Sequence, residues 1–551
     1  LPKRQRKPPA YLGDYVTDLE DDEIGGSDQV FSNIDYCYKL SAFPQTYPEA
    51  MESPDSSNWE IAMKEEMNSL EENNTFTLTT LPEGRNSVGG RWVYTIKEDA
   101  SGGKSYKARY VAKGYSQVKG IDYQETFAPT ASPTSVRVLM QIAAQNDLIL
   151  HQMDVKTAYL NAPIDCEIYI DQAEGFEVPS DSKGKLVYRL NKSLYGLKQS
   201  GRNWNNVLHC FLLENDFVQS PVDNCMYTKQ IGDRRVILLI WVDDVVIAAS
   251  DMDLMDKVKG MMKERFRMKD LGKLTYFLGI DFVEGDGCVR MNQKRYISKV
   301  LERFDMLHCK PKSTPAEQKL DFGNETPFEP RRYREAVGSL IYAMTSTRPD
   351  ICWVVTKLSQ HLSNPTNNHW VAVKHVLRYL KGTLNYELCF KKSDKNLKLI
   401  GYSDADWASS IDDRRSVSGY CFSLSAAGPL ISWKSKKQPT VALSSCEAEY
   451  IALSTAVQEG LYLTQLLNGL VETDEPVLIF EDNQGTIALS KNPVSHQRSK
   501  HIDIRYHFIR TALHEGKVAI EYCPTADMIA DVMTKPATKF KLDKFSKFIF
   551  G

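Results

Sequence analysis

An apolar run near the middle of the chain is interrupted by two adjacent carboxylates. Residues 236–250 read VILLIWVDDVVIAAS, with Asp243 and Asp244 at the centre. An unpaired ionised carboxylate is costly to bury, so this pair must either leave the core or find a partner. Aspartate tolerates turn dihedrals, and the flanking apolar segments suit two buried strands. The run therefore predicts a β-hairpin whose tight turn carries both acids out of the core.

A divalent metal ion would neutralise the two like charges at such a turn. Mg²⁺ prefers oxygen ligands and is often bound by one or two carboxylates together with substrate phosphates. A further acid, Asp154, ends the strand predicted for LILHQMDV. A solvated acidic turn is the competing interpretation, and the strands on both sides favour the metal site. On this hypothesis Asp154 and Asp243 bridge two ions, and Asp244 is a further ligand.

Length and composition limit the classes of protein to consider. A chain of 551 residues exceeds a single core, which stops growing near about 250–300 residues, so two or three domains are expected. The net charge of -3 means that any nucleic-acid role depends on local basic surfaces and bound cations. The 11 cysteines include no C-x-x-C pair, which argues against a disulfide framework or zinc cluster and favours an intracellular protein. No apolar run approaches the roughly 18 residues of a membrane span, so no membrane partner is expected.

Local patterns indicate where the folded parts lie. Residues 1–50 change from basic to acidic and are expected to be a flexible linker, and the start at Leu1 indicates a piece of a longer polyprotein. Helical spacing of apolar residues begins at Trp59. The strands RWVYTIK and SYKARYVAKGY predict a basic hairpin. From Leu397 onward, strands alternate with helices.

A second group of acids follows residue 397. The segments GYSDADWASS, SSCEAEYIALSTAV, VLIFEDNQGTIAL and TADMIADVMTKP each place acids at a predicted strand end or on a helix. Acids that converge from separate elements can hold two Mg²⁺ ions for phosphodiester hydrolysis. Each acid taken alone is more often an ordinary surface or capping residue.

The motifs in the first half resemble a known family. SNWEIAMKEEMNSL, RWVYTIK, YKARYVAKGYSQVKGIDYQETFAP, HQMDVKTAYLNAPI, SLYGLKQSGRNW and LLIWVDDVVIA, in this order and spacing, resemble the reverse transcriptase of copia-type LTR retrotransposons. The resemblance implies a fingers-palm-thumb polymerase whose catalytic metals bind Asp154, Asp243 and Asp244. It implies Mg²⁺ as the cofactor, two ions per active site, with Mn²⁺ as a substitute.

Other residues receive roles from the same resemblance. Tyr159 falls where an aromatic stacks under the incoming sugar and excludes a 2′-hydroxyl, with a core tyrosine as the alternative. Lys107 and Arg109 are candidates for the triphosphate, with a solvated strand face as the alternative. YFLGI at 276–280 resembles the hairpin that grips the primer end. Trp241 stands where tyrosine or phenylalanine usually precedes V-D-D, which is expected to alter fit or fidelity beside the primer.

The second group of acids, with the run SKHIDIRYHFIR, resembles the ribonuclease H domain that follows copia-type reverse transcriptases. The resemblance implies metal ligands at Asp404, Glu449, Asp482 and Asp531. Glu449 is preferred to Glu447 because it shares a helix face with Ala452 and Ala456. Asp406 is a nearby alternative to Asp404.

Basic residues near the last acid are candidates for contact with the phosphates of an RNA–DNA hybrid, which is recognised by shape and 2′-hydroxyls. A charged helix face is the alternative for each. The histidines His501 and His507 are expected to be structural, because the predicted site is built from oxygen donors. The candidate contacts are Arg498, Lys500, Arg505 and Arg510.

These inferences combine into an α+β multidomain chain, with a right-hand polymerase followed by a ribonuclease H-like α/β domain. The expected parts are a linker at 1–50, fingers and palm at 51–304, thumb and connection helices at 305–396, the ribonuclease H domain at 397–540 and a C-terminal tail at 541–551. We expect an enzyme that copies element RNA into DNA and degrades the RNA of the hybrid, for transposition and DNA integration. The alternative is an inactive or recruited relic that binds hybrids.

The expected partners are an RNA template, a DNA primer, deoxynucleoside triphosphates and other Pol and Gag products. The expected location is the cytoplasm, in virus-like particles, or the nucleus.

Overall fold

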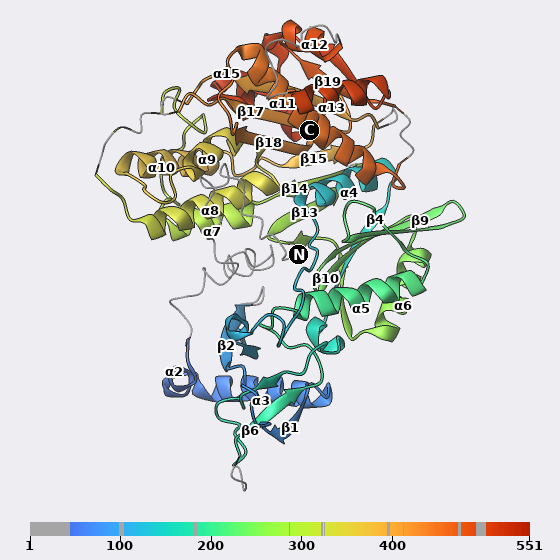
Figure 1. Cartoon of the computed structure of the whole chain (residues 1–551), viewed down its shortest axis with the longest axis vertical. Coiled ribbons are helices and arrows are strands. Elements are labelled where there is room, and N and C mark those ends of the chain that lie inside the picture. Colours follow the sequence, from blue (N-terminus) through green and yellow to red (C-terminus); the bar gives the residue numbers. More distant parts are fainter. Residues whose placement is uncertain are drawn as a thin grey trace, which may run out of the picture. The chain divides into compact units, whose positions relative to one another are not determined.

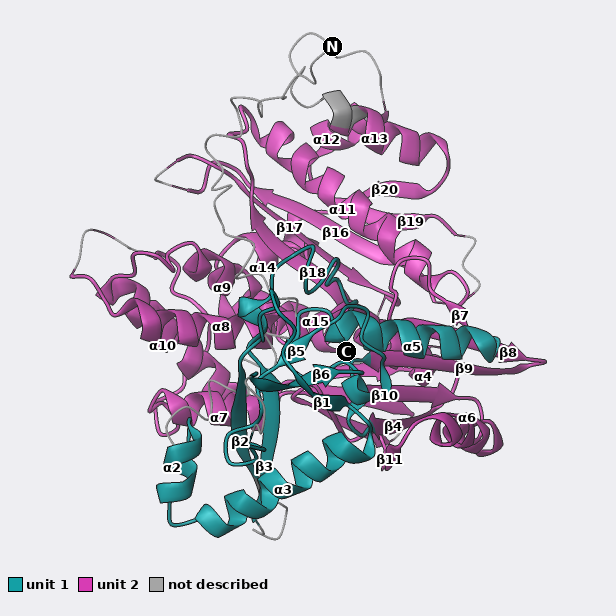
Figure 2. Ribbon diagram, turned by 60° about the horizontal axis from the view of Figure 1, so that its bottom comes forward, with its two compact units in different colours: residues 1–130, 155–216, 241–243 teal, residues 131–154, 217–240, 244–551 magenta. Residues whose placement is uncertain are grey.

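The computed structural model describes residues 44–98, 104–179, 184–285, 287–320, 323, 326–393, 397–410, 413–426, 428–471, 475–491 and 503–551. It combines helices with several β-sheets, as expected of an α+β protein (Figure 1). Two compact units are distinguished in Figure 2, residues 1–130, 155–216 and 241–243, and residues 131–154, 217–240 and 244–551. Among the described helices, none has the length and apolar character needed to cross a membrane.

The described part of the first unit contains a hairpin, a small sheet and the helices α2, α3 and α5. Strand β2 (Gly90–Glu98) pairs antiparallel with β3 (Lys104–Ala112), as the two basic segments predict. The small sheet has the order β1-β6-β5. The remaining bounds are α2 (Tyr47–Glu52), α3 (Ser56–Glu72), β1 (Phe76–Thr80), β5 (Tyr169–Ile170), β6 (Leu186–Leu190) and α5 (Ser200–Glu214).

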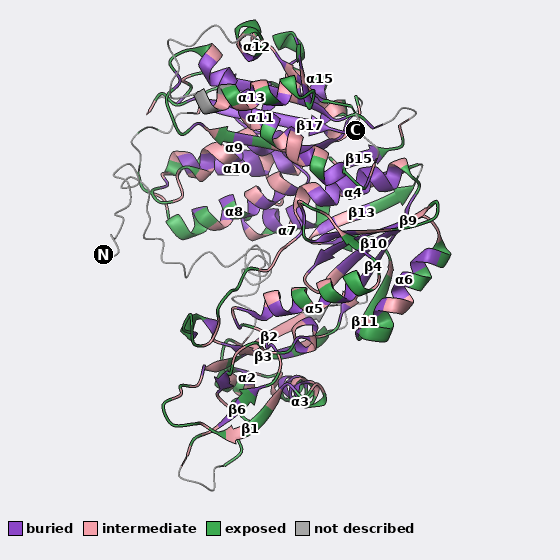
Figure 3. Cartoon of the chain, turned by 45° about the vertical axis from the view of Figure 1, so that its right-hand side comes forward, coloured by how far each residue is buried: buried purple, intermediate pink, exposed green. Residues whose placement is uncertain are grey.

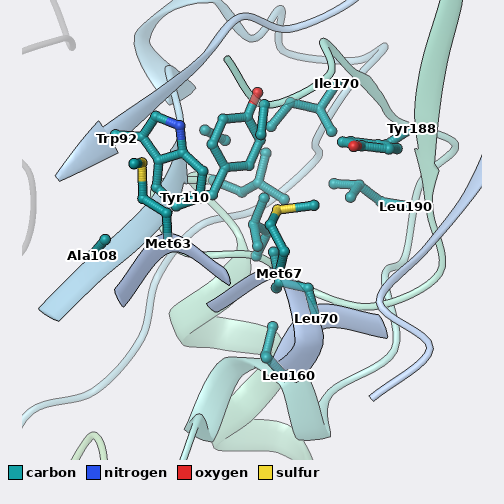
Figure 4. Close-up of a cluster of buried hydrophobic side chains, with 14 of the residues drawn as sticks. Met63, Met67, Leu70, Trp92, Ala108, Tyr110, Leu160, Ile170, Tyr188 and Leu190 are labelled. Atoms are coloured by element: carbon teal, nitrogen blue, oxygen red, sulfur yellow. The ribbon is translucent and has the colours of Figure 1, made fainter. Parts of the chain in front are cut away.

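Helix α3 supplies one side of the core of this unit. Its apolar residues recur at helical spacing, so one face is buried with Trp92 and Tyr110 of the hairpin (Figure 4). The folded part begins earlier than the sequence pattern indicates, since α2 is capped by Thr46 and its Ala50 is fully buried. The buried residues of α3 are Trp59, Ala62, Met63, Met67 and Leu70.

The second unit begins with a six-stranded sheet of order β11-β4-β10-β9-β8-β7. Helix α4 (Pro133–Gln145) begins after Ser132, whose side chain accepts a hydrogen bond from the Ser135 amide. Figure 3 shows α4 as a largely buried helix. The other bounds are β4 (Ile149–Val155), β7 (Val218–Gln219), β8 (Met226–Ile231), β9 (Arg234–Trp241), β10 (Asp244–Ala249), α6 (Met252–Arg265) and β11 (Met268–Lys273).

A four-stranded sheet and a group of helices follow in the chain. The YFLGI segment forms the predicted hairpin, with β12 (Tyr276–Phe277) antiparallel to β13 (Ile280–Gly285). This sheet continues through β14 (Cys288–Asn292) and β15 (Leu388–Lys391). The helices are α7 (Lys294–Arg303), α8 (Pro330–Ser346), α9 (Cys352–Ser359) and α10 (Asn367–Gly382).

The C-terminal part is built on a five-stranded mixed sheet of order β18-β17-β16-β19-β20. The central strand β16 (Ile400–Asp406) runs antiparallel to β17 (Val417–Ser423) and parallel to β19 (Val477–Glu481). With its helices, this sheet forms an α/β arrangement, in agreement with the alternating strands and helices expected from Leu397 onward. The other bounds are β18 (Leu430–Lys437), α11 (Ser445–Leu467), α12 (Gln484–Lys491), α13 (Asp503–His514), β20 (Val518–Tyr522), α14 (Asp531–Thr534) and α15 (Lys539–Phe550).

The last residues differ from expectation. Residues 541–551 are expected to be a tail, but they continue helix α15, and Leu542, Phe545 and Ile549 are buried in a cluster with Val532 and Met533. The spacing of these three apolar residues places them on one helix face, which explains the packing.

Candidate active sites

The two acids of the apolar run lie at a tight turn between β9 and β10. Val242 has a positive φ of 53° within this turn, a conformation that glycine usually supplies and that strains a β-branched residue. Asp243 and Asp244 are half-buried, whereas Trp241 on the preceding strand is 7% exposed. The local structure therefore agrees with the predicted hairpin, and the indole of Trp241 is packed inside.

Strand pairing in the six-stranded sheet brings two predicted metal ligands to one register position. Strand β10 runs antiparallel to β4, and Asp244 lies directly opposite Asp154. The side-chain amide of Gln152, which shares a strand face with Asp154, donates a hydrogen bond of 2.9 Å to Oδ1 of Asp244. Asp243 precedes Asp244 in the chain. Gln152 was not among the predicted site residues, although it stands in the same QMDV motif.

The main chain of the acidic turn is fixed by two hydrogen bonds. The indole N–H of Trp204 donates to the Val242 carbonyl oxygen at 2.7 Å. The Val155 amide donates to the Asp243 carbonyl oxygen at 2.8 Å. Trp204 belongs to the SLYGLKQSGRNW motif. The sequence resemblance includes this motif but assigns no role to Trp204. Its position shows that this motif supports the turn.

The candidate nucleotide-binding residues are partly brought together within the first unit. Lys107 and Arg109 lie on the exposed face of β3, while Ala108 between them is buried. The Arg109 guanidinium lies 4.5 Å from the centre of the Tyr195 ring, and the Tyr195 and Tyr159 rings are 4.8 Å apart. Tyr159 is half-buried rather than a core residue. Tyr195, which joins two of the candidates, was missed by the sequence reasoning.

Three of the acids predicted in the C-terminal part gather at one place. The three are Asp404 on β16, Glu449 on α11 and Asp482 just after β19. Each offers a carboxylate oxygen, and these atoms lie within 4.8 Å of one another. Glu447 instead accepts a hydrogen bond from the Leu443 amide at 2.8 Å and helps to cap α11. Asp406, two residues after Asp404, is not in the group of three.

The electrostatics of this group match a cation site. Burial, followed by the neighbouring carboxylates, raises the pKa of Glu449 to about 11. Burial is also the main cause that raises the pKa of Asp404 to about 6. The Oε2 atom of Glu449 is buried and has no hydrogen-bond partner among the described residues. Buried carboxylates held this closely require protons or a bound cation.

A further acid, Glu481, adds to the negative charge near the group of three. Glu481 ends β19, is fully buried, and burial holds its pKa well above the usual range. Asp482, the next residue, accepts a hydrogen bond of 2.7 Å from the Thr525 hydroxyl. The sequence reasoning missed Glu481 and Thr525. Glu481 directly precedes Asp482 in the FEDN segment, and this adjacency is the sequence feature that points to Glu481.

Asp531, the fourth predicted acid, is not in the group of three and is paired with lysines. It is buried on α14, and its carboxylate forms ion pairs with Lys535 at 2.8 Å and with Lys541. Lys535 also lies 3.5 Å from Asp404. The Asp531–Lys535 spacing of four residues on a helical segment is a sequence signal for such a pair.

The predicted hybrid contacts are only partly described. Arg505 donates to the Ile451 carbonyl oxygen at 3.4 Å, and Arg510 donates to the Leu489 carbonyl oxygen at 3.1 Å. Both side chains are half-buried, and their role in hybrid contact stays a prediction. His507 is exposed on α13. Arg498, Lys500 and His501 lie outside the described residues.

Residues 73–318 match the family described as reverse transcriptase (RNA-dependent DNA polymerase). A Retrovirus-related Pol polyprotein from transposon TNT 1-94 of Nicotiana tabacum is 42% identical over 516 residues, which cover 91% of this chain and 38% of that relative. A putative transposon Ty5-1 protein of Saccharomyces cerevisiae is 32% identical over 313 residues, which cover 56% of this chain and 100% of that protein.

Among solved structures, the foamy viral protease-reverse transcriptase in complex with double-stranded DNA has a TM-score of 0.49 at 11% identity, covering 85% of this chain and 70% of that one. The chain belongs to the family of copia-type retrotransposon Pol polyproteins and contains their reverse transcriptase region. It spans little more than a third of the length of the tobacco relative.

Proposed function

We propose that this chain is the RNA-directed DNA polymerase and ribonuclease H of a copia-type LTR retrotransposon. It copies element RNA into DNA and degrades the RNA strand of the resulting hybrid. The observation that supports the proposal most directly is the register of β4 and β10, which sets Asp154 opposite Asp244 beside Asp243. The family of residues 73–318 supports the same reaction.

The polymerase acids fit divalent cations because they offer hard carboxylate oxygens at a fixed turn. Asp154, Asp243 and Asp244 would hold two Mg²⁺ ions, with Mn²⁺ as a substitute. Bound ions would supply activation of the primer 3′-hydroxyl and charge neutralisation at the departing pyrophosphate. Gln152 holds the Asp244 carboxylate in one orientation, and the hydrogen bond from Trp204 holds the turn.

Substrate binding falls to residues of the first unit. Lys107 and Arg109 present positive charge on the exposed face of β3, which suits the triphosphate of a deoxynucleotide. The Tyr159 ring, packed beside Tyr195, offers a surface under the sugar. A ring at this position would exclude a 2′-hydroxyl by its volume and so select deoxynucleotides.

The C-terminal group fits a cation as well, since the orphaned Glu449 Oε2 atom lies within a set of three carboxylates. Asp404, Glu449 and Asp482 would hold a divalent ion, which supplies a metal-activated water for hydrolysis of RNA. Arg498, Lys500, Arg505 and Arg510 are proposed to contact the hybrid phosphates.

The proposed partners are an RNA template, a DNA primer, the hybrid that forms from them and other Pol and Gag products of the element. The proposed location is the cytoplasm, in virus-like particles, or the nucleus. Both follow from the organisation of Pol polyproteins, of which this chain spans a part.

Primer extension on an RNA template with Mg²⁺ tests the polymerase. Wild-type protein should extend the primer, and Asp243→Asn should not, because the amide removes a negative ligand. Asp233→Asn, at an exposed turn between β8 and β9, is the matched control and should extend normally. Equal extension by wild type and Asp243→Asn would show that the site is wrong. Absence of extension by both would favour a relic that binds hybrids without catalysis.

Cleavage of a labelled RNA–DNA hybrid tests the second activity. Wild-type protein should cut the RNA strand, and Asp482→Asn should not. Glu515→Gln, on an exposed part of the same domain, is the control and should cut normally. Undiminished cleavage by Asp482→Asn would rule out the carboxylate group as the hydrolytic site.

A further inference from the structure

Helix α14 and the residues after it bring two lysines to the edge of the carboxylate group. Asp531 is buried, with its side chain 1% exposed, so its charge requires compensation. Its Oδ1 atom lies 2.8 Å from Lys535 Nζ, and its Oδ2 atom pairs with Lys541 Nζ. Both oxygens of Asp531 are therefore already engaged by cations.

Lys535 also reaches Asp404 on β16. Its Nζ atom lies 3.5 Å from both Oδ1 and Oδ2 of Asp404. The Thr534 hydroxyl donates to Oδ2 of the same carboxylate. Lys535 thus stands between Asp404 and Asp531, two buried acids that come from separate elements.

The charges of the two aspartates and the two lysines balance. Asp404 and Asp531 carry two negative charges, and Lys535 and Lys541 carry two positive charges. The Lys535 ammonium lies 2.8 Å from an oxygen of Asp531 and 3.5 Å from Asp404, so it compensates both carboxylates. A divalent ion placed between the two aspartates would meet this ammonium at close range. Repulsion between like charges disfavours that arrangement.

We propose that the Lys535 ammonium takes the place of a second divalent ion between Asp404 and Asp531, so that the C-terminal site holds a single divalent ion on Asp404, Glu449 and Asp482. The inference rests on the proposed ribonuclease H function. It revises the expectation that Asp531 ligates a metal and that this site holds two ions. Lys535 is a positioning residue, which holds Asp404 and supplies fixed positive charge beside the bound ion.

The number of bound Mn²⁺ ions, counted on the full chain by electron paramagnetic resonance, tests the proposal. The count is made in the presence of an RNA–DNA hybrid whose RNA strand is 2′-O-methylated and therefore resists cleavage. Lys535→Met should bind one ion more than wild type, because Asp404 and Asp531 then lose their shared cation. Lys535→Arg keeps the positive charge and should bind the wild-type number. Ions at the polymerase acids contribute equally to every variant.

Lys541→Met is the matched control, because Lys541 pairs with Asp531 and is as exposed as Lys535, at 35% and 37%. It should bind the wild-type number of ions. If Lys535→Met is unfolded by circular dichroism, Lys535→Gln is counted in its place. An unchanged count in the folded Lys535 variant would overturn the proposal.

The ion count of Glu449→Gln distinguishes a failure of the proposed metal site from a failure of the role of Lys535. Glu449→Gln should lose one ion relative to wild type if the carboxylate group binds metal at all. Loss of that ion together with an unchanged count in Lys535→Met would leave the hydrolytic site in place and reject the role of Lys535. No loss in Glu449→Gln would reject the metal site itself, and the inference with it.

Discussion

Gln152 donates a hydrogen bond of 2.9 Å from its side-chain amide to the Oδ1 atom of Asp244. Gln152 is 6% exposed and lies two residues before Asp154 on β4. The buried amide of Gln152 therefore fixes the carboxylate of Asp244, which lies opposite Asp154. Partners of this kind orient metal ligands and affect affinity for the metal.

Replacement of Gln152 by methionine should lower nucleotide incorporation by about tenfold to a hundredfold and raise the Mg²⁺ concentration needed for half-maximal rate. The physical reason is the loss of the donor that orients Asp244. Gln219→Met, on the edge strand β7, removes an amide away from the acids and should leave both quantities unchanged. The measurement is primer extension across a Mg²⁺ titration, and an unaltered Mg²⁺ requirement in Gln152→Met would contradict the assigned role.

Substitution of Trp204 by phenylalanine removes the hydrogen bond to the Val242 carbonyl while it keeps an aromatic ring in a buried position. A neutral hydrogen bond contributes about 1 kcal/mol, so folding should be preserved. We expect primer extension to fall several-fold and hybrid cleavage to stay at the wild-type level. Equal losses of both activities would indicate general destabilisation instead of support for the turn.

Stability without metal should decrease as pH rises. Burial raises the pKa of Glu449 from 4.5 to about 11 and that of Asp404 from 3.8 to about 6, so the folded chain keeps protons that the unfolded chain releases. Unfolding then releases protons, and the free energy of unfolding falls with increasing pH above the ordinary carboxyl pKa. Glu449→Gln cannot ionise and should flatten the decline between about pH 5 and pH 8.

Urea unfolding of wild type and Glu449→Gln in EDTA across this pH range checks the expectation. Added Mg²⁺ should restore stability to wild type at pH 8 and have less effect on Glu449→Gln, since a bound cation replaces the protons. Identical pH slopes for the two proteins would contradict the buried, protonated state of Glu449.

Arg137 joins the polymerase sheet region to the C-terminal sheet within the second unit. It is 3% exposed, donates to the carbonyl oxygens of Ile431 at 2.6 Å and Ser346 at 2.9 Å, and lies 4.0 Å from the Trp433 ring centre. Arg137→Leu leaves these buried acceptors unpaired and should cost about 3 kcal/mol. The exposed Arg331→Leu is the control and should cost less than about 0.5 kcal/mol in the same urea titration.

The hairpin at Asp243 and the strand that carries Asp154 were predictable, because an apolar run broken by acids has few other solutions. Helix α11 was predictable for the same kind of reason, since Glu449 falls on a regular helix face. In each case the information is local. Residues close in the sequence determine the element, and the element determines the direction of the side chain.

Contacts between distant segments were not predictable. Arg137 stands in an apolar helix and has partners almost 300 positions later in the chain, which no local pattern indicates. The convergence of Asp404 and Asp482 depends on the parallel pairing of β16 with β19. The four-residue spacing of Asp531 and Lys535 indicates that they can pair on a helix. The second contact of Lys535, with Asp404, depends on how α14 packs on the sheet.

Single-turnover incorporation of one deoxynucleotide on an RNA template tests the central claim most directly. We expect Asp154→Asn, Asp243→Asn and Asp244→Asn each to lower the rate by at least about a hundredfold, because each removes a carboxylate that would hold the divalent ions at the transition state. Asp233→Asn should keep the wild-type rate. A wild-type rate in any of the three site variants would contradict the assignment of that acid, and wild-type rates in all three would contradict the account.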